Sequence, residues 1–225
     1  MPLPGIELET AANPKHVVIW LHGLGADGHD FEPIVPELVD RSWPALRFVF
    51  PHAPMRPITI NGGMRMRAWY DISGMEIAQR QDEAGLRESM GLLNDMIERE
   101  VERGIASENI LLAGFSQGGA IVLGGGIRCS RPLCGIIALS TYLPMAEKTD
   151  AEKSAANRAT PIFLAHGMLD PTIPHALGEM SRGYLVQRGY NVDWHAYQMA
   201  HQVSMEEITD LRRWIGARLG GKQGS

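Results

Sequence analysis

The 225-residue sequence contains little cysteine and no excess of basic residues, and each shortage excludes a class of protein. Its two cysteines, Cys129 and Cys134, are too few for a disulfide framework and lack companions for a zinc site. We expect free thiols in a reducing compartment, with a local disulfide as the alternative. The 21 basic residues are outnumbered by 26 acidic ones, for a net charge of -5. Because nucleic-acid binding needs clustered positive charge, we expect no nucleic-acid partner.

Long apolar runs are also absent. The longest ones, such as residues 17–21, are far shorter than the roughly 20 residues that cross a bilayer, so we expect no stable membrane insertion. The opening MPLPGIELET has no basic segment followed by an apolar stretch, so we expect no signal peptide and a cytoplasmic protein. The composition, 44% hydrophobic and 21% charged, is typical of a globular chain. At this length we expect one domain over residues 1–225.

Short apolar runs alternate with longer segments of helical period. Five runs rich in Val, Ile and Leu predict buried strands at residues 16–21, 46–50, 109–113, 134–139 and 161–165. Residues 82–103 carry apolar side chains at steps of three and four, which predicts a long helix, and the last segment repeats this pattern. Residues 192–197 alternate and predict a strand near the sheet edge. This order predicts an α/β fold with a mostly parallel sheet, helices on both faces and functional residues beyond the carboxyl ends of the strands.

Two segments show no clear period. Residues 51–70 contain three prolines and the pair Gly62-Gly63, and we expect one long irregular connection there. Residues 140–160 are expected to form a surface excursion. Neither segment resembles an interdomain linker.

Residues 114–118 read Gly-Phe-Ser-Gln-Gly, which matches the pattern G-x-S-x-G. With 25 glycines in the chain the pattern alone is a weak signal, but a predicted strand precedes it and an apolar, helix-like stretch follows. A nucleophile elbow requires this strand–turn–helix setting, which presents a serine hydroxyl at the amino end of a helix. We therefore predict that Ser116 is a nucleophile. The alternative is a glycine-rich turn with a capping serine.

A serine hydroxyl needs a neighbouring imidazole to take its proton. Among eight histidines, His201 follows the last predicted strand and precedes the final helix, so we predict that it is the base. His22 and His166 each end a strand and are expected to make local hydrogen bonds. Asp170 follows another strand and is predicted to orient the imidazole, with Asp150 as a weaker rival and a helix cap as the alternative role. The chain order Ser, Asp, His is that of an α/β-hydrolase.

Acyl transfer also needs backbone donors aimed at the developing oxyanion. The amide of Gln117 directly follows the predicted nucleophile and supplies one. The glycine-rich loop at residues 22–28 follows an early strand, and we predict that Leu24 supplies the other. The same loop lacks the Lys and Ser/Thr of a P-loop and the third glycine of a dinucleotide fingerprint, which disfavours a nucleotide site.

Six motifs carry a resemblance to a known family. HGLGADG, NGG, WYDI, GFSQGG, HGMLDPTIP and MAHQVSMEEI stand in this order within residues 17–219. They resemble the bacterial carboxylesterase family related to acyl-protein thioesterases. The resemblance implies a single α/β-hydrolase domain without a lid domain or cofactor, acting on carboxylic or thioester bonds. It assigns the nucleophile, acid, base and oxyanion amides to the positions reached above: Ser116, Asp170, His201, Leu24 and Gln117.

The chain departs from the family pattern at a few positions. Met64 stands where tryptophan is common after NGG, which implies a more pliable wall of the acyl pocket. Ala200 replaces the Gly or Met that often precedes the histidine. Trp69 matches the family motif, and we expect it either to bind substrate or to pack in the core.

These residues predict a serine hydrolase that cleaves short- to medium-chain carboxylic esters through an acyl-enzyme. An acyl-protein thioesterase remains an alternative, because both reactions pass through the same intermediate, and a non-catalytic hydrolase-fold interaction protein remains another. The expected partner is a small-molecule ester or acyl thioester. A homodimer is left open, since an exposed sheet edge or the Met-rich loop could support one.

Independence from metal ions is the first testable consequence. The sequence has no H-E-x-x-H motif and no set of thiolates that would bind zinc. We predict that ester hydrolysis survives overnight dialysis against a chelator, measured as the turnover rate before and after treatment. A reversible loss that zinc or manganese restores would contradict the serine mechanism.

Overall fold

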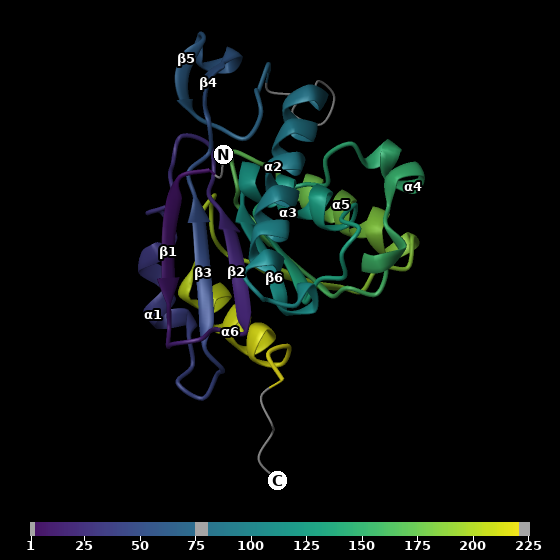
Figure 1. Cartoon of the computed structure of the whole chain (residues 1–225). Coiled ribbons are helices and arrows are strands. Elements are labelled where there is room, and N and C mark those ends of the chain that lie inside the picture. Colours follow the sequence, from purple (N-terminus) through teal and green to yellow (C-terminus); the bar gives the residue numbers. More distant parts are fainter. Residues whose placement is uncertain (1–2, 75–80, 221–225) are drawn as a thin grey trace.

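Seven strands form the central sheet of a computed structural model that describes residues 3–74 and 81–220 (Figure 1). Their order across the sheet is β1-β3-β2-β6-β7-β8-β9. The strands are β1 (Gly5–Glu9), β2 (His16–Leu21), β3 (Leu46–Pro51), β6 (Ile110–Phe115), β7 (Gly135–Leu139), β8 (Ile162–Gly167) and β9 (Val192–Tyr197). Only β1 pairs antiparallel with its neighbour, so the predicted mostly parallel sheet is confirmed for the described residues, and β9 lies at the expected edge. The predicted domain, residues 1–225, extends beyond the described ranges.

Helices cover both faces of this sheet (Figure 1). One face packs against α2 (Glu83–Glu102), α3 (Gln117–Gly126) and α5 (His175–Gln187), and the other against α1 (Val35–Leu38) and α6 (Met205–Gly216). Successive residues of β2 point to opposite faces, so Ile19 lies in the first core and Trp20 in the second. Both side chains are buried, which explains why the strand reads as an unbroken apolar run.

Two parts of the chain differ from the sequence-based expectation. The edge strand β1 was not predicted, because its alternation of exposed and half-buried residues covers only five positions. The segment 51–70 is not wholly irregular: β4 (Met55–Ile58) and β5 (Met64–Arg67) form an antiparallel hairpin around the short helix η2 (Thr59–Asn61). Gly62 and Gly63 have φ angles of 65° and 79°, a conformation that glycine adopts readily, and they turn the chain between the two strands.

The expected surface excursion at residues 140–160 contains only short helical turns. They are η4 (Ala146–Lys148), α4 (Thr149–Glu152) and η5 (Ala155–Asn157).

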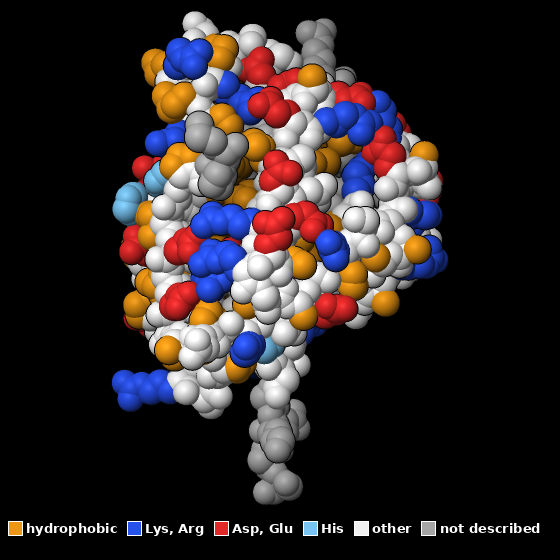
Figure 2. All heavy atoms as spheres, viewed as in Figure 1, with side chains coloured by type: hydrophobic (Ala, Val, Ile, Leu, Met, Phe, Trp, Pro, Cys, Tyr) orange, Lys and Arg blue, Asp and Glu red, His pale blue; other side chains and the backbone are white. Residues whose placement is uncertain are grey.

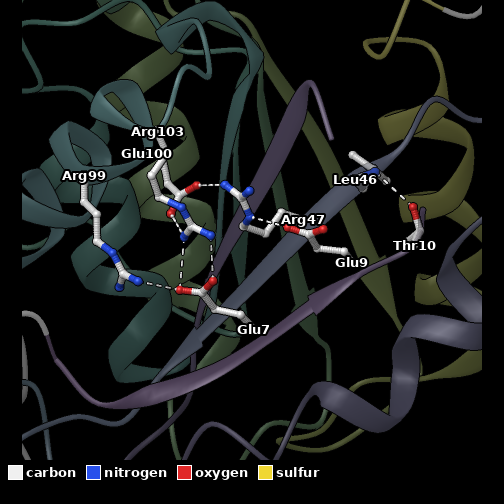
Figure 3. Close-up of polar contacts among 8 residues, drawn as sticks. All are labelled: Glu7, Glu9, Thr10, Leu46, Arg47, Arg99, Glu100 and Arg103. Carbon is white, nitrogen blue, oxygen red and sulfur yellow. Dashed lines mark hydrogen bonds and ion pairs between the residues drawn. The ribbon is translucent and has the colours of Figure 1, made fainter. Parts of the chain in front are cut away.

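An alternating series of carboxylates and guanidinium groups joins β1 to β3 and α2 (Figure 3). At its centre the buried carboxylate of Glu100 accepts hydrogen bonds from Arg47 at 2.6 Å and from Arg103 at 2.7 Å. Arg103 also contacts Glu7 of β1, at 2.9 Å, and Arg47 contacts Glu9 of the same strand, at 3.0 Å. Because each charge has opposite neighbours, burial of Glu100 is compensated, and the edge strand is attached to the helix layer.

A second buried carboxylate has no such compensation. Glu207 lies in the first turn of α6, where the hydroxyl of Ser204 accepts a hydrogen bond from its backbone N–H at 3.2 Å. Its side chain is fully buried, and neither carboxyl oxygen has a hydrogen-bond partner among the described residues. Burial, with a smaller contribution from nearby Asp210, raises the pKa of Glu207 to about 8, against a partial opposing effect of the Ser204 backbone N–H.

This raised pKa predicts a pH-dependent stability. The unfolded chain releases the Glu207 proton near pH 4.5, whereas the folded protein keeps it until about pH 8. Between these values the folded state binds more protons, so its free energy of unfolding falls as pH rises, by up to about 1.4 kcal/mol per unit. We expect Glu207→Gln to unfold at a higher temperature than the wild type at pH 8.5 and to gain much less at pH 4.5.

Thermal unfolding at several pH values would measure this difference. The exposed neighbour Glu206 gives a matched control, because Glu206→Gln removes the same charge without changing a buried group. An equal effect of Glu207→Gln at every pH would contradict the prediction.

Candidate active site

The carboxyl ends of β2 and β6 lie side by side at the centre of the sheet. From β2 the chain passes to β3 on one side, and from β6 it continues to β7, β8 and β9 on the other. Leu21 is paired with Gly114 across the two strands, so the residues that follow each strand meet at one edge. Open α/β sheets place their sites at such reversals of strand order.

Ser116 occupies a strained turn between β6 and α3. Its backbone angles are φ 55° and ψ -118°, which non-glycine residues rarely adopt and which costs on the order of 1–3 kcal/mol. The surrounding chain holds this conformation: the Ser116 N–H donates to the Leu139 carbonyl at 2.9 Å. Its own carbonyl accepts from the Thr141 hydroxyl at 2.8 Å and from the Ala120 N–H at 3.0 Å.

The two glycines of the motif allow the backbones around Ser116 to approach closely. A Cβ atom on Gly118 would lie 2.2 Å from the carbonyl oxygen of Leu21, and one on Gly114 would lie 2.4 Å from the oxygen of Gly118. Neither position has room for a side chain. Their spacing in the sequence is therefore a packing requirement of this turn.

The three predicted side chains lie in one hydrogen-bonded series. The Ser116 hydroxyl is 2.9 Å from Nε2 of His201, and Nδ1 of His201 is 2.6 Å from a carboxylate oxygen of Asp170. Since that oxygen accepts, Nδ1 carries the proton and Nε2 is free to accept one from the serine. The other Asp170 oxygen accepts from the backbone N–H groups of Thr172 and Ile173, at 2.8 and 2.9 Å, which fixes the carboxylate.

Two residues that support this series were not predicted as supports. The ring of Phe115 packs against that of His201, with centroids 4.7 Å apart. His166 is fully buried, and its Nε2 donates to the carbonyl of Ile173 at 2.8 Å, which holds the loop that carries Asp170. The expected local bond of His166 is thereby confirmed. Phe115 occupies the variable second position of G-x-S-x-G, so the motif itself carries no signal for it.

Both predicted oxyanion donors belong to segments beside Ser116. Gln117 is the first residue of α3, and backbone N–H groups in a first turn have no acceptor within their helix. The loop that carries Leu24 lies against the serine, since a Cβ on Gly23 would be 3.4 Å from the Ser116 Cβ. A carbonyl oxygen placed between these segments would meet a helix amino terminus and a second backbone turn.

Trp69 connects the two segments from inside the core. The side-chain amide of Gln117 accepts from the Trp69 N–H at 3.0 Å and donates to the Tyr70 carbonyl at 2.9 Å. The indole N–H of Trp69 donates to the His22 carbonyl at 2.8 Å. Trp69 is fully buried, which favours the core-packing alternative, and a substrate contact of its side chain stays a prediction.

Met64 lies on β5, and its side chain is 64% exposed. Figure 2 shows apolar and basic side chains gathered on the projecting hairpin. The N–H of Gly25 donates to the carbonyl of Arg67 at 2.9 Å, which attaches β5 to the loop of Leu24. Met64 itself lies at the opposite end of β5 from Arg67, beside the turn of this solvent-facing hairpin. A substrate contact there stays a prediction.

A cavity of about 230 Å³ opens beside the loop that follows β7. Its first lining residue on that loop, Tyr142, directly follows Thr141, whose hydroxyl contacts the Ser116 carbonyl. The hydroxyl of Ser181 lies between Leu143 and Leu177, with hydrogen bonds to both backbones at 2.8 and 2.7 Å. Because this hydroxyl is satisfied within the protein, the cavity offers mainly apolar surface from Leu143, Ala146, Leu177 and Met180.

Other expected features can be compared with the described residues. Cys129 and Cys134 are both free thiols. No helix within residues 3–74 and 81–220 has the length and apolar character needed to cross a membrane.

Comparison with known proteins identifies the class. Residues 6–219 match the model of the Phospholipase/Carboxylesterase family, and the chain belongs to that family. It is therefore a hydrolase with the α/β-hydrolase fold, from a family of esterases and thioesterases. Acyl-protein thioesterase 1 of Neurospora crassa is 38% identical over 96% of this chain and 92% of that protein. The Yarrowia lipolytica protein of the same name is 36% identical over 95% and 96%.

Solved structures agree on the fold. Arabidopsis thaliana SOBER1 has a TM-score of 0.86 at 29% identity, covering 91% of this chain and 99% of that one. Zea mays acyl-protein thioesterase 2 has a TM-score of 0.84 at 25% identity, covering 96% and 100%. These relatives are fungal and plant proteins, so they support the family and not the bacterial branch that the motifs suggested.

Proposed function

We propose that this protein is a serine hydrolase that cleaves carboxylic esters through an acyl-enzyme. Ser116 is the nucleophile, His201 the general base and acid, and Asp170 the group that orients His201. The backbone N–H groups of Leu24 and Gln117 form the oxyanion hole. The observation that carries the proposal is a hydrogen-bonded series beyond the carboxyl ends of the strands. The Ser116 hydroxyl lies 2.9 Å from Nε2 of His201, and Nδ1 of His201 lies 2.6 Å from the Asp170 carboxylate.

In the first half-reaction Nε2 of His201 takes the proton of the Ser116 hydroxyl while the serine oxygen attacks the carbonyl carbon. Negative charge on the carbonyl oxygen is stabilised by the two amides. His201 then gives its proton to the leaving oxygen or sulfur, and the acyl group remains on Ser116. In the second half-reaction His201 takes a proton from water, the hydroxide attacks the acyl-enzyme, and the acid leaves with Ser116 protonated again.

Two substrate classes fit this chemistry. Oxygen esters with short- to medium-chain acyl groups are our first choice, and an acyl-protein thioester is the alternative. The names of the fungal relatives favour the alternative, because they are acyl-protein thioesterases. A cytoplasmic location is part of the proposal, and the two free thiols support it.

The nucleophile is tested by Ser116→Ala. We expect ester turnover to fall by roughly 10⁵ to 10⁶, because no serine hydroxyl remains at this position to be acylated. Covalent labelling by a fluorophosphonate should disappear, while circular dichroism stays that of the wild type. Labelling that persists on another serine would disprove the assignment. A wild type with neither labelling nor turnover would instead favour the non-catalytic interaction protein.

We propose that the cavity beside β7 receives the acyl chain, because the loop that forms one of its walls also contacts the backbone of Ser116. Each buried methylene contributes about 0.8 kcal/mol, so kcat/KM should rise with chain length until the apolar walls end. Leu177→Trp fills part of the cavity, and we expect it to lower kcat/KM for the longer p-nitrophenyl esters while sparing the acetate. Acylated peptides assayed in parallel would distinguish the thioesterase alternative from an esterase, since a thioesterase should hydrolyse the peptide thioesters faster than the p-nitrophenyl esters.

Met64→Trp tests the other predicted acyl contact, because it adds the same indole on the exposed hairpin. If Met64→Trp loses activity on the longer esters and Leu177→Trp does not, the acyl chain binds at the hairpin and not in the cavity. Since we expect no lid, the wild type should also show no jump in rate above the solubility limit of the ester.

A further inference from the structure

Two histidines outside the series of Ser116 link the loop of Leu24 to the segment that follows β3. The loop, residues 22–28, follows β2, and the neighbouring segment contains His52 and Ala53. Each segment gives one imidazole that accepts a backbone hydrogen bond from the other. Neither histidine has a role in the proton transfers described above.

His22 uses both of its ring nitrogens. Nδ1 is 2.7 Å from the carbonyl oxygen of Gly23, which can only accept, so Nδ1 carries the proton. Nε2 then has a lone pair and accepts the N–H of Ala53 at 3.0 Å. The ring is 1% exposed, and burial lowers the pKa of His22, which keeps it in this neutral form.

His52 makes the reciprocal contact. Its Nδ1 accepts the backbone N–H of Gly28 at 3.0 Å, at the far end of the same loop. The backbone of Gly28 also packs closely against β3, because a Cβ on Gly28 would lie 2.3 Å from the carbonyl oxygen of Phe50. Because a backbone N–H can only donate, Nδ1 of His52 is the ring nitrogen that offers its lone pair.

The loop is therefore fixed at both ends. At one end Gly23 packs against Ser116, since a Cβ added to Gly23 would lie 3.4 Å from the Ser116 Cβ. At the other end Gly28 is held by the hydrogen bond to His52. Leu24 lies between them, and the loop has one further described backbone bond to β5, from the N–H of Gly25 to the carbonyl of Arg67. A shift of either end would change where the Leu24 amide points.

We propose that His22 and His52 are positioning residues of the oxyanion hole, which hold the Leu24 amide through reciprocal hydrogen bonds to backbone N–H groups. The inference rests on the proposed function of this loop. Because oxyanion donors act mainly on the transition state, a displaced amide should lower kcat and leave KM nearly unchanged.

His52 gives the sharper test, since it is only partly buried. His52→Leu removes the acceptor, and we expect kcat for a soluble ester to fall about tenfold, less than the 10²-fold or greater loss that follows removal of an oxyanion donor. His52→Asn places a carbonyl oxygen where Nδ1 stood and should restore most of the rate. His29 is the control: it packs beside the His52 ring, and its ring bonds to Glu32 while its backbone N–H donates to Asp27, so His29→Leu should keep wild-type kcat.

The buried partner is tested by coupling. His22→Gln keeps an acceptor for the Ala53 N–H but loses the geometry of the donor to Gly23. If both histidines hold the same amide, the double variant with His52→Leu should lose less kcat than the product of the two single losses. Melting temperatures would show that each variant is folded, and fluorophosphonate labelling rates should fall in parallel with kcat.

The inference is overturned, while the proposed function stands, by an active His52→Leu with unchanged kcat or by an equal loss in His52→Leu and His52→Asn. A rise in KM with unchanged kcat would also overturn it, since that pattern marks ground-state binding. A wild type without ester turnover or labelling of Ser116 would overturn the proposed function and this inference with it.

Discussion

The conformation of Ser116 is the constraint on which the site depends. A serine at φ 55° is held here by hydrogen bonds to both of its backbone polar groups, which come from the end of β7, the loop that follows it and the first turns of α3. The same turn forces α3 against the end of β2, a contact so close that residue 118 has no room for a Cβ. The strain of one residue is thus held in place by contacts with β7, α3 and the end of β2.

The parallel sheet then determines which other residues can reach the serine. Asp170 follows β8 and His201 follows β9, so both arrive at the same edge although 31 positions separate them in the chain. Hydrogen bonds from the backbone of residues 172 and 173 fix the carboxylate, and an aromatic ring fixes the plane of the imidazole. The rigid strands set the positions, and short loops supply the chemistry.

The sequence alone predicted those site residues whose positions depend on local patterns. Ser116, Asp170 and His201 each follow a recognisable strand, and parallel strands bring such positions together. The contacts of Trp69 and of the Gln117 side chain involve partners 47 or 48 positions away, and nothing in either local sequence indicates the other. β1 was missed because five alternating residues give a weak pattern. The exposure of Met64 was missed because prolines and glycines masked a hairpin whose pairing is decided by its turn.

The order of these residues along the chain has a consequence during synthesis. Ser116 is joined to the growing polypeptide 85 residues before His201, which lies in the last loop before α6. In a ribosome-bound intermediate that ends before residue 201, Ser116 has no His201 to accept its proton. Under the proposed mechanism an unfinished chain of this kind would not acylate its serine, so ester hydrolysis would begin only after the last loop before α6 is made.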